Sequence, residues 1–234
     1  MLTENDRQWL AEHYPNLLVE SDDKVVGEVS FTATYNKESG HFLEIELDTV
    51  DGVGGLRLSG IFQITITART TTPHSRLPAL TIEGVETISD RHINQSDLSA
   101  CLCNPLEEDG YLDPQFDFRS YFKELVMPFL YGQLYYSQEG HWPWFDYAHG
   151  GLGTIEAFSR NPTPEKANEC IQKISREVQL WKTVKPLLLQ REDIKGHTLC
   201  PCPKHDHLRR CHPMALEGLR LLQNTIREHL IQLP

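Results

Sequence analysis

An alternation of apolar and polar residues between residues 25 and 68 limits the folds open to this chain more than any other feature. The alternation occupies residues 28–35, 43–48 and 56–68, and a shorter run follows at residues 80–82. Because successive side chains on a strand point to opposite faces of a sheet, each run predicts a strand that is buried on one face. The turn-forming residues 36–40 favour an antiparallel hairpin between the first two runs. The four runs together predict a four-stranded antiparallel meander.

Helical signals flank this strand region. Thr3 is a favourable N-cap residue with Asp6 three positions later, and Pro15 marks the end of the short helix that they predict. Apolar residues return at helical spacing after the strands, in segments that begin near residue 116, at Thr163 and at Pro213. The chain is therefore expected to be α+β, with one helix before the sheet and several after it.

These later helices carry more detailed expectations. Pro128 is expected to bend or divide the first of them, because proline lacks the N–H that a helix interior needs. The helix that begins at Thr163 is expected to keep one apolar face as far as Val178 and Trp181, with Cys170 buried on that face. The last helix is expected to bury Ala215, Leu219, Leu222, Ile226 and Leu230.

A long connection without periodicity, residues 84–113, separates the strands from the later helices and carries two thiols. Its central part places His92 and Asn94 a short polar loop ahead of Cys101 and Cys103. This combination suits acyl transfer, in which a thiolate attacks a carbonyl carbon and an amide side chain donates a hydrogen bond to the developing oxyanion. The alternative is that two small sulfur-containing side chains pack in a core.

Composition narrows the classes of function. The chain has 33 Asp and Glu against 22 Lys and Arg, a net charge of −11, which argues against a general nucleic-acid binder. No apolar run approaches the roughly 18 residues of a membrane span, and the N-terminus lacks the pattern of a secretory signal. We therefore expect a cytoplasmic protein with no membrane partner. In that reducing compartment, cysteines are expected to be catalytic, metal-bound or buried.

The order of these elements, together with the thiol loop, resembles the ubiquitin-conjugating enzymes. That family has a helix, a four-stranded meander, a long crossing with a cysteine and then helices, and a His-Pro-Asn motif precedes its active cysteine-leucine pair. Here His92-Ile93-Asn94 precedes Cys101-Leu102, and the resemblance covers residues 1–160. Ile93 replaces the motif proline, and the loop is one residue shorter than usual when counted to Cys101 and one too long when counted to Cys103.

Two downstream segments are similar to a particular branch of this family. Trp142-Pro143-Trp144 and His149-Gly150-Gly151 resemble the tryptophan-rich and histidine-glycine segment of divergent bacterial ubiquitin-conjugating-like proteins from antiphage defence operons. This resemblance implies a role in bacterial defence.

The resemblance implies a reaction and a set of roles. Cys101 accepts the C-terminal acyl group of a ubiquitin-like protein from an activating enzyme as a thioester, and a lysine amine of a protein target then attacks it. Asn94 donates to the oxyanion. His92 either holds the loop or acts as a base, and His149 either faces the thiol or packs among aromatic side chains. Acidic residues after the thiols, Glu107–Asp109, could accept a proton from the amine, although such a run is more often solvated surface.

Two other functions stay open at this point. One is a catalytically inactive adaptor with the same fold, which the imperfect motif allows. The other is a cysteine peptidase that uses Cys101 and His149 as a dyad. A catalytic thiol of that class commonly begins a helix, where the helix dipole favours the thiolate, whereas Cys101 lies in an aperiodic stretch.

A second cluster of cysteine and histidine residues lies near the C-terminus. Cys200 and Cys202 are separated by one residue, and Cys211 and His212 follow after eight more. Three thiols and an imidazole are a ligand set of structural zinc, and four protein ligands leave no position for a substrate. The spacing resembles the SEC-C motif, although Pro203-Lys204-His205 replaces its glycine-serine-glycine turn. His205 or His207 could replace one ligand.

These observations predict three parts. Residues 1–160 form the ubiquitin-conjugating-like core, residues 161–195 a helical extension, and residues 196–234 a tail that structural zinc stabilises. The tail is expected to contact a protein partner through Lys204, Arg209 and Arg210.

Overall fold

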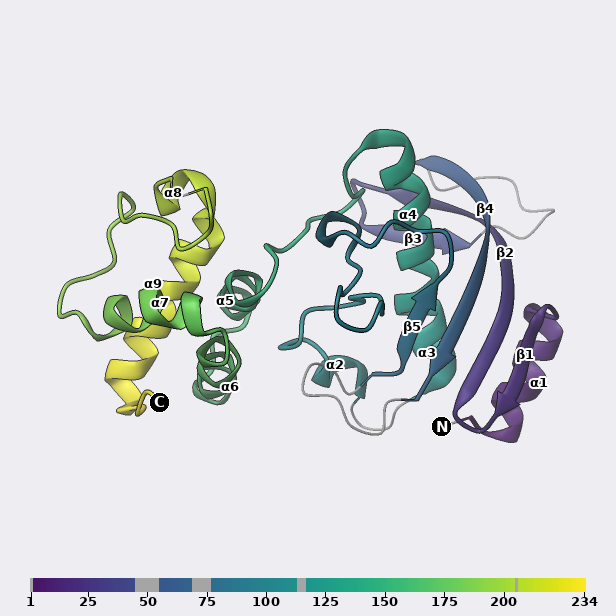
Figure 1. Cartoon of the computed structure of the whole chain (residues 1–234), viewed down its shortest axis with the longest axis horizontal. Helices are drawn as coiled ribbons and strands as arrows, with labels where there is room; N and C mark the ends of the chain where they lie inside the picture. The colour runs from purple at the N-terminus through teal and green to yellow at the C-terminus, as the bar shows by residue number, and fades with distance from the viewer. Residues whose placement is uncertain (1, 45–54, 69–76, 113–116, 205) are drawn as a thin grey trace. The chain divides into compact units, whose positions relative to one another are not determined.

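The computed structural model describes residues 2–44, 55–68, 77–112, 117–204 and 206–234. The chain forms two compact units, shown in Figure 1. The N-terminal unit comprises Met1–Cys103 and Glu108–Asp146, and the C-terminal unit comprises Asn104–Glu107 and Tyr147–Pro234.

The first helix, α1 (Glu4–His13), begins with a capping box. The Thr3 hydroxyl oxygen accepts a hydrogen bond from the Asp6 amide at 3.2 Å, and the Asp6 carboxylate accepts one from the Thr3 amide at 2.9 Å. These two bonds satisfy amides that have no partner within the first helical turn. The predicted N-cap is confirmed, and Trp9 and Leu10 are buried as expected.

One antiparallel sheet follows. Its strands are β1 (Leu17–Ser21), β2 (Lys24–Asn36), β3 (His41–Glu44), β4 (Leu56–Thr67) and β5 (Ala79–Ile82). Four of them lie in the order β1-β2-β4-β5, and β3 pairs with β2 off this path. The buried face of β2 carries Val25, Val29, Phe31 and Ala33, so the predicted alternation holds along the central strand.

The four predicted runs all contribute antiparallel strands, β2, β3, β4 and β5, but the predicted meander order is wrong, because β2 pairs directly with β4. The run at residues 43–48 was expected to be a member of the meander, yet β3 lies off the path, and residues 45–48 fall outside the described residues. A further strand, β1, was not predicted, and it pairs with β2. The strand β1 was not predicted because it opens with three consecutive apolar residues and not with an alternation of apolar and polar ones. The middle residue of the three, Leu18, is 68% exposed.

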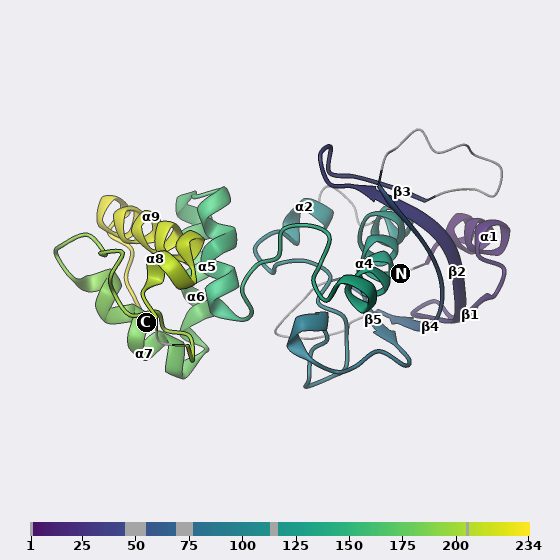
Figure 2. The same cartoon turned by 90° about the horizontal axis from the view of Figure 1, so that it is seen from above.

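A long helical segment covers one face of this sheet (Figures 1 and 2). It consists of α3 (Phe118–Tyr121), the π-helical turn η2 (Phe122–Val126) and α4 (Met127–Glu139). The π turn ends two residues before Pro128, so the helix is irregular where the proline leaves a carbonyl without its usual N–H partner. The helix α4 packs on β4 at Gly60, where a Cβ atom would come within 2.7 Å of Leu134.

The connection between β5 and α3 contains two short helices, η1 (Ser89–Arg91) and α2 (Asp109–Leu112). It is otherwise irregular in its described part, as predicted. Two isolated bridges fold it back, Thr81 with Ser99 and Ile93 with Ala100.

The C-terminal unit is helical. Its helices are α5 (Gly151–Arg160), α6 (Pro164–Ser175), α7 (Val178–Leu189), α8 (Leu208–Cys211) and α9 (Pro213–His229). They share one core, and α5 lies so close to α9 that a Cβ atom at Gly218 would meet the Ile155 carbonyl oxygen at 2.2 Å. The expected boundaries at residues 160 and 195 differ from this division, because α5 and the C-terminal tail belong to the same core.

Two expectations about the helical faces need correction. The helix that begins after Thr163 ends at Ser175, and a new helix starts at Val178, which is 59% exposed rather than buried. The amides of Arg176 and Glu177 bond to carbonyls three residues back, which ends α6. Leu230 is also exposed, because it follows α9 in a left-handed conformation. Cys170 is fully buried as predicted.

In the described part of the chain, no helix has the length and apolar character required to span a bilayer.

Candidate thiol site and metal centre

The loop from residue 92 to residue 101 is folded back on itself, which brings its two ends together. The Cys101 amide donates a 2.7 Å hydrogen bond to the His92 carbonyl oxygen, and the Asn94 amide donates one of 2.8 Å to the Ser99 carbonyl oxygen. The Ala100 amide bonds to the carbonyl oxygen of Leu80 in β5 at 2.7 Å. The edge of the sheet therefore holds the loop, and His92 and Cys101 lie side by side.

Side chains brace the interior of this loop. The Asn94 side-chain amide donates a 3.0 Å hydrogen bond to the Ser99 hydroxyl, which in turn donates one of 2.6 Å to the Asp97 carboxylate. An amide group carries two N–H donors, so the bond to Ser99 occupies one of them. Asn94 is exposed, and its backbone amide bonds to Ser99, two residues before the thiol of Cys101.

The two candidate thiols differ in accessibility. Cys101 is exposed, with its sulfur 3.9 Å from the Cys103 carbonyl oxygen. Cys103 is partly buried and packs against the hydrophobic core of the N-terminal unit. Access of a large acyl donor therefore favours Cys101, and the alternative that both sulfurs pack in a core does not hold for this residue.

His92 connects the thiol with an acidic residue from a distant part of the chain. Its Nε2 atom lies 2.9 Å from Asp146 Oδ1, and its side chain also makes a hydrogen bond with Cys101. Burial alone would lower the pKa of His92, but the hydrogen bonds with Asp146 and Cys101 outweigh it and raise the pKa to about 9. His92 is then an imidazolium at neutral pH, and in that state it has no lone pair with which to act as a base.

Trp142 fixes the orientation of this histidine. The indole ring meets the His92 ring edge to face, with centroids 4.8 Å apart and an interplanar angle of 74°. The indole N–H donates a 2.8 Å hydrogen bond to the Asp90 carbonyl oxygen, immediately before the loop. The aromatic segment after α4 thus packs against the thiol site, within the N-terminal unit.

The other predicted residues lie as follows. His149 belongs to the C-terminal unit, and the imidazole beside Cys101 is that of His92. Glu108 is only 4% exposed and Glu107 accepts a 2.6 Å hydrogen bond from Tyr147, so the expectation of a solvated acidic run is wrong for these two residues. Asp146 was not predicted, although it is the only acidic residue within residues 140–153.

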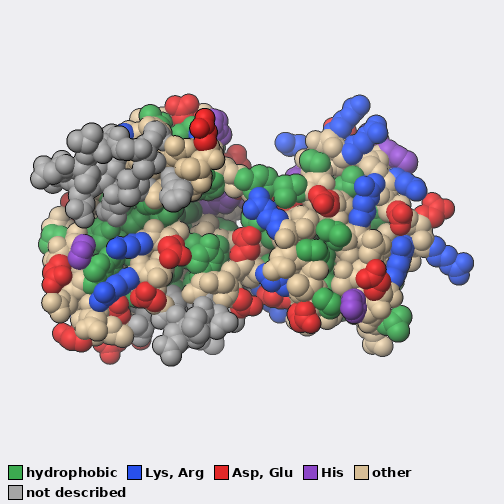
Figure 3. All heavy atoms as spheres, turned by 180° about the vertical axis from the view of Figure 1, so that it is seen from behind, with side chains coloured by type: hydrophobic (Ala, Val, Ile, Leu, Met, Phe, Trp, Pro, Cys, Tyr) green, Lys and Arg blue, Asp and Glu red, His purple; other side chains and the backbone are tan. Residues whose placement is uncertain are grey.

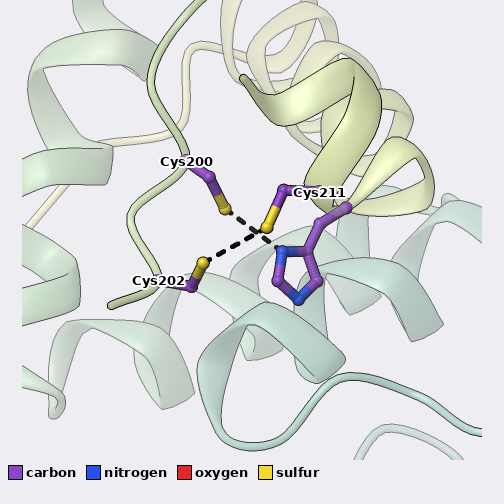
Figure 4. Close-up of side chains that lie close together, drawn as sticks. Cys200, Cys202 and Cys211 are labelled. Atoms are coloured by element: carbon purple, nitrogen blue, oxygen red, sulfur yellow. Dashed lines mark hydrogen bonds between the residues drawn. The ribbon is translucent and has the colours of Figure 1, made fainter. Parts of the chain in front are cut away.

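The C-terminal cysteine and histidine residues converge from two segments. Cys200 and Cys202 lie on a loop in which the Cys200 amide bonds to the Asp206 carbonyl oxygen at 2.7 Å, whereas Cys211 ends α8 and His212 precedes α9 (Figure 4). The loop closes through an isolated bridge between Leu199 and His207.

The ligand atoms of these four residues lie close enough to share one ion. Cys200 Sγ is 3.1 Å from His212 Nδ1, Cys202 Sγ is 3.3 Å from Cys211 Sγ, and all four ligand atoms lie within 4.8 Å of one another. Zinc–sulfur bonds of about 2.3 Å in a tetrahedron place ligand atoms about 3.8 Å apart, which fits this cluster. Burial, together with the neighbouring thiol of Cys202, raises the pKa of Cys200 to about 12, and a bound cation would reverse this effect by stabilising the thiolate.

The four residues predicted as ligands form this cluster. His207 is not a member of it, and His205 lies outside the described residues. Cys200 is 1% exposed and belongs to the core of the C-terminal unit together with Leu208 and Ala215. A metal ion here would join the loop before α8 to the start of α9, so the cluster suits a structural role.

The chain was compared with protein-family models, curated proteins and solved structures, and none of these comparisons gives a match.

Proposed function

We propose that this protein is a thiol-dependent acyl carrier of the ubiquitin-conjugating type. Cys101 would take the C-terminal acyl group of a ubiquitin-like protein from an activating enzyme and pass it to a lysine amine of a target protein. The observation that carries this proposal is the exposed Cys101 thiol. The Cys101 amide bonds to the His92 carbonyl oxygen, the His92 side chain makes a hydrogen bond with Cys101, and Asn94 lies on the same loop.

The backbone of the thiol loop supports a functional role. In the described part of the chain, three residues other than glycine have positive φ, and two of them, His92 and Leu98, lie in this loop. Such a conformation costs about 1–2 kcal/mol per residue and persists only where the surroundings hold it, often at functional sites. The layout is also consistent with the proposal, since α1 and the strands β1, β2, β4 and β5 precede the thiol crossing and the long helical segment follows it.

The reaction would have two balanced steps. First, the Cys101 thiolate attacks the thioester carbonyl carbon of the activated donor; a C–S bond forms, and the donor's sulfur leaves as a thiolate. Second, the lysine nitrogen attacks the same carbon, a C–N bond forms, the bond to Cys101 breaks, and the amine proton passes to solvent or to a nearby base. In each step the carbonyl oxygen becomes an oxyanion. In the second step, discharge onto lysine, the Asn94 amide would donate to it, an interaction worth about 2.7–4 kcal/mol in other acyl-transfer enzymes.

The C-terminal cluster would bind structural zinc in this proposal. Cys200, Cys202, Cys211 and His212 would be the ligands, and zinc would contribute folding free energy to the unit. Many Lys and Arg side chains lie on the face of the C-terminal unit seen in Figure 3. The exposed Lys204, Arg209 and Arg210 would serve contact with a protein partner. The proposed setting is a bacterial defence pathway in the cytoplasm.

A peptide that ends in a Gly-Gly thioester can test the carrier chemistry without knowledge of the natural partner. We expect the folded protein to form a reductant-sensitive adduct on Cys101 faster than the same chain does in denaturant, and free lysine to discharge it. The adduct should be lost in Cys101→Ala and kept in Cys103→Ala. A Cys101 thiol that is acylated no faster in the folded chain than in the denatured one would leave the inactive adaptor as the better reading.

A further inference from the structure

We propose that Asp146 is the positioning residue of the thiol site, and that it holds His92 as a cation against the sulfur of Cys101. The three side chains would form a Cys-His-Asp triad. His92 would contact the reacting sulfur, and Asp146 would act on that sulfur only through His92. The effect on the nucleophilic reactivity of the Cys101 thiol does not depend on the proposed function. The extension of this effect to acyl transfer rests on the function proposed above.

The contact between Asp146 and His92 is close and sheltered. The distance from His92 Nε2 to Asp146 Oδ1 is 2.9 Å, and the two side chains are 16% and 38% exposed. Trp142 covers one side of the imidazole. A histidine ring that is fixed on one nitrogen by a carboxylate presents its other nitrogen in a defined direction, which is how orienting carboxylates act in catalytic triads.

Among the described residues, the groups that favour the cationic state of His92 are Asp146 and Cys101. The neighbouring Arg91 guanidinium is directed elsewhere, toward Glu86 at 3.5 Å, Gln133 at 3.2 Å and Ser137 at 3.1 Å. The interactions that favour a charged His92 come from Asp146 and Cys101. Of these two partners Asp146 is the carboxylate, and its Oδ1 atom lies 2.9 Å from His92 Nε2.

A cationic His92 has a specific consequence for the reaction. A cation beside a cysteine stabilises the thiolate, which is both the attacking form of the sulfur and the form in which it leaves. When the lysine nitrogen attacks the thioester, the C–N bond forms, the electron pair of the C–S bond returns to the Cys101 sulfur, and the imidazolium stabilises that negative charge. His92 would therefore not remove the amine proton, which must pass to another group or to water.

The rate of Cys101 alkylation by iodoacetamide, followed by mass spectrometry of the peptide, tests the inference without any acyl donor. The full chain is compared with Asp146→Asn, His92→Gln and the double variant between pH 5 and pH 10. We expect Asp146→Asn to slow alkylation at pH 7 about threefold to tenfold, with the difference vanishing toward pH 10 where thiols ionise without help. In the His92→Gln background, Asp146→Asn should have no further effect, since the carboxylate acts only through the imidazole.

Glu12→Gln on α1 is the matched control, because it removes the same charge from a helix that is not part of the thiol loop. Equal alkylation profiles for Asp146→Asn and Glu12→Gln would overturn the inference. A structural role alone would change unfolding but would not produce a pH-dependent loss that His92→Gln abolishes.

A measurement on the unaltered protein removes any dependence on the folding of a variant. In a sample with isotopically labelled histidine, the His92 ring should remain protonated at pH 8, and a ring that titrates near pH 6.5 would contradict the inference. The two proposals can fail separately. A chain that shows the Asp146-dependent alkylation profile but no peptide thioester exchange has an activated thiol with a different substrate.

Discussion

Trp142 lies directly against Gly132 of α4, so closely that a Cβ atom at residue 132 would come within 2.0 Å of the indole Cζ3 atom. The same indole also meets the His92 ring, and its N–H donates a hydrogen bond to the Asp90 carbonyl oxygen. The helix that covers the sheet therefore determines where the tryptophan lies, and the tryptophan determines where the histidine beside Cys101 lies.

Gly132→Ala should displace the indole and disturb the thiol site. Alanine is normally the better helix residue, but the clash with a rigid ring should outweigh this and destabilise the N-terminal unit by about 1–3 kcal/mol. Amide hydrogen exchange in β2 and α4 measures the loss, and Cys101 alkylation should slow in parallel. Gly110→Ala in α2 is the control, since its Cβ atom would meet nothing within 4 Å. Equal exchange rates in the two variants would contradict the proposed packing.

The ion pair of His92 and Asp146 predicts a pH-dependent stability. The pKa of His92 rises from 6.5 to about 9 on folding, so the folded state favours the protonated form. The stabilisation is fully present below the unfolded pKa and is lost as the pH rises through about 9. We expect Asp146→Asn to destabilise the N-terminal unit by about 1–2 kcal/mol at pH 6, less than the full pKa difference implies because Asp146 is partly solvated. Near pH 10 the two proteins should be equally stable, and a difference that is constant from pH 6 to pH 10 would exclude this pair as its source.

Asn94→Ala should affect discharge of the thioester onto lysine more than its formation, with about a hundredfold loss if the amide stabilises the oxyanion. The same side chain braces the loop through Ser99, so a slower reaction by itself does not identify its role. Ser99→Ala removes the bracing partner and keeps the amide. We expect this second variant to react nearly normally in single-turnover discharge of the peptide adduct. Equal losses in both variants, or equal effects on both steps, would assign Asn94 to loop structure alone.

Removal of metal should unfold part of the C-terminal unit and leave the N-terminal unit intact. The protein as purified is expected to contain about one equivalent of zinc, and a chelator or Cys211→Ala should lower protection from hydrogen exchange in α8 and α9 by about a hundredfold or more. Protection in β2 and β4 should not change. Cys103→Ala is the control, because it removes a thiol that is not in the cluster. Unchanged protection of α8 and α9 in a metal-free protein would refute the structural role.

Local signals in the sequence were sufficient for several elements. The Thr3 and Asp6 capping box involves residues three apart, and the buried face of β2 follows from a period of two, so neither depends on distant parts of the chain. The four metal-ligand candidates were also predictable, because they lie within thirteen residues, from Cys200 to His212, and a short closed loop brings them together. The same reasoning failed at β1 and at the break between α6 and α7. At β1 three consecutive apolar residues show no alternation, and pairing with β2 forms the strand. After α6 the apolar pattern continued, but the helix ended at Ser175.

The thiol site shows what the sequence by itself could determine and what it could not. The short segment from His92 to Cys101 carries a thiol, an imidazole and an amide in an order that predicts acyl-transfer chemistry, and a local hairpin-like loop is enough to bring His92 beside Cys101. The choice of Cys101 over Cys103 and the charge on His92 depended on the tertiary structure. The choice between the thiols follows from their exposure. The charge on His92 follows from its burial and its contact with Asp146, and Trp142 packs against the same ring. Both Asp146 and Trp142 come after α4 in the sequence and are far from His92 along the chain. A pKa depends on solvent exclusion and on charges in space, and neither is encoded in the spacing of residues along the chain.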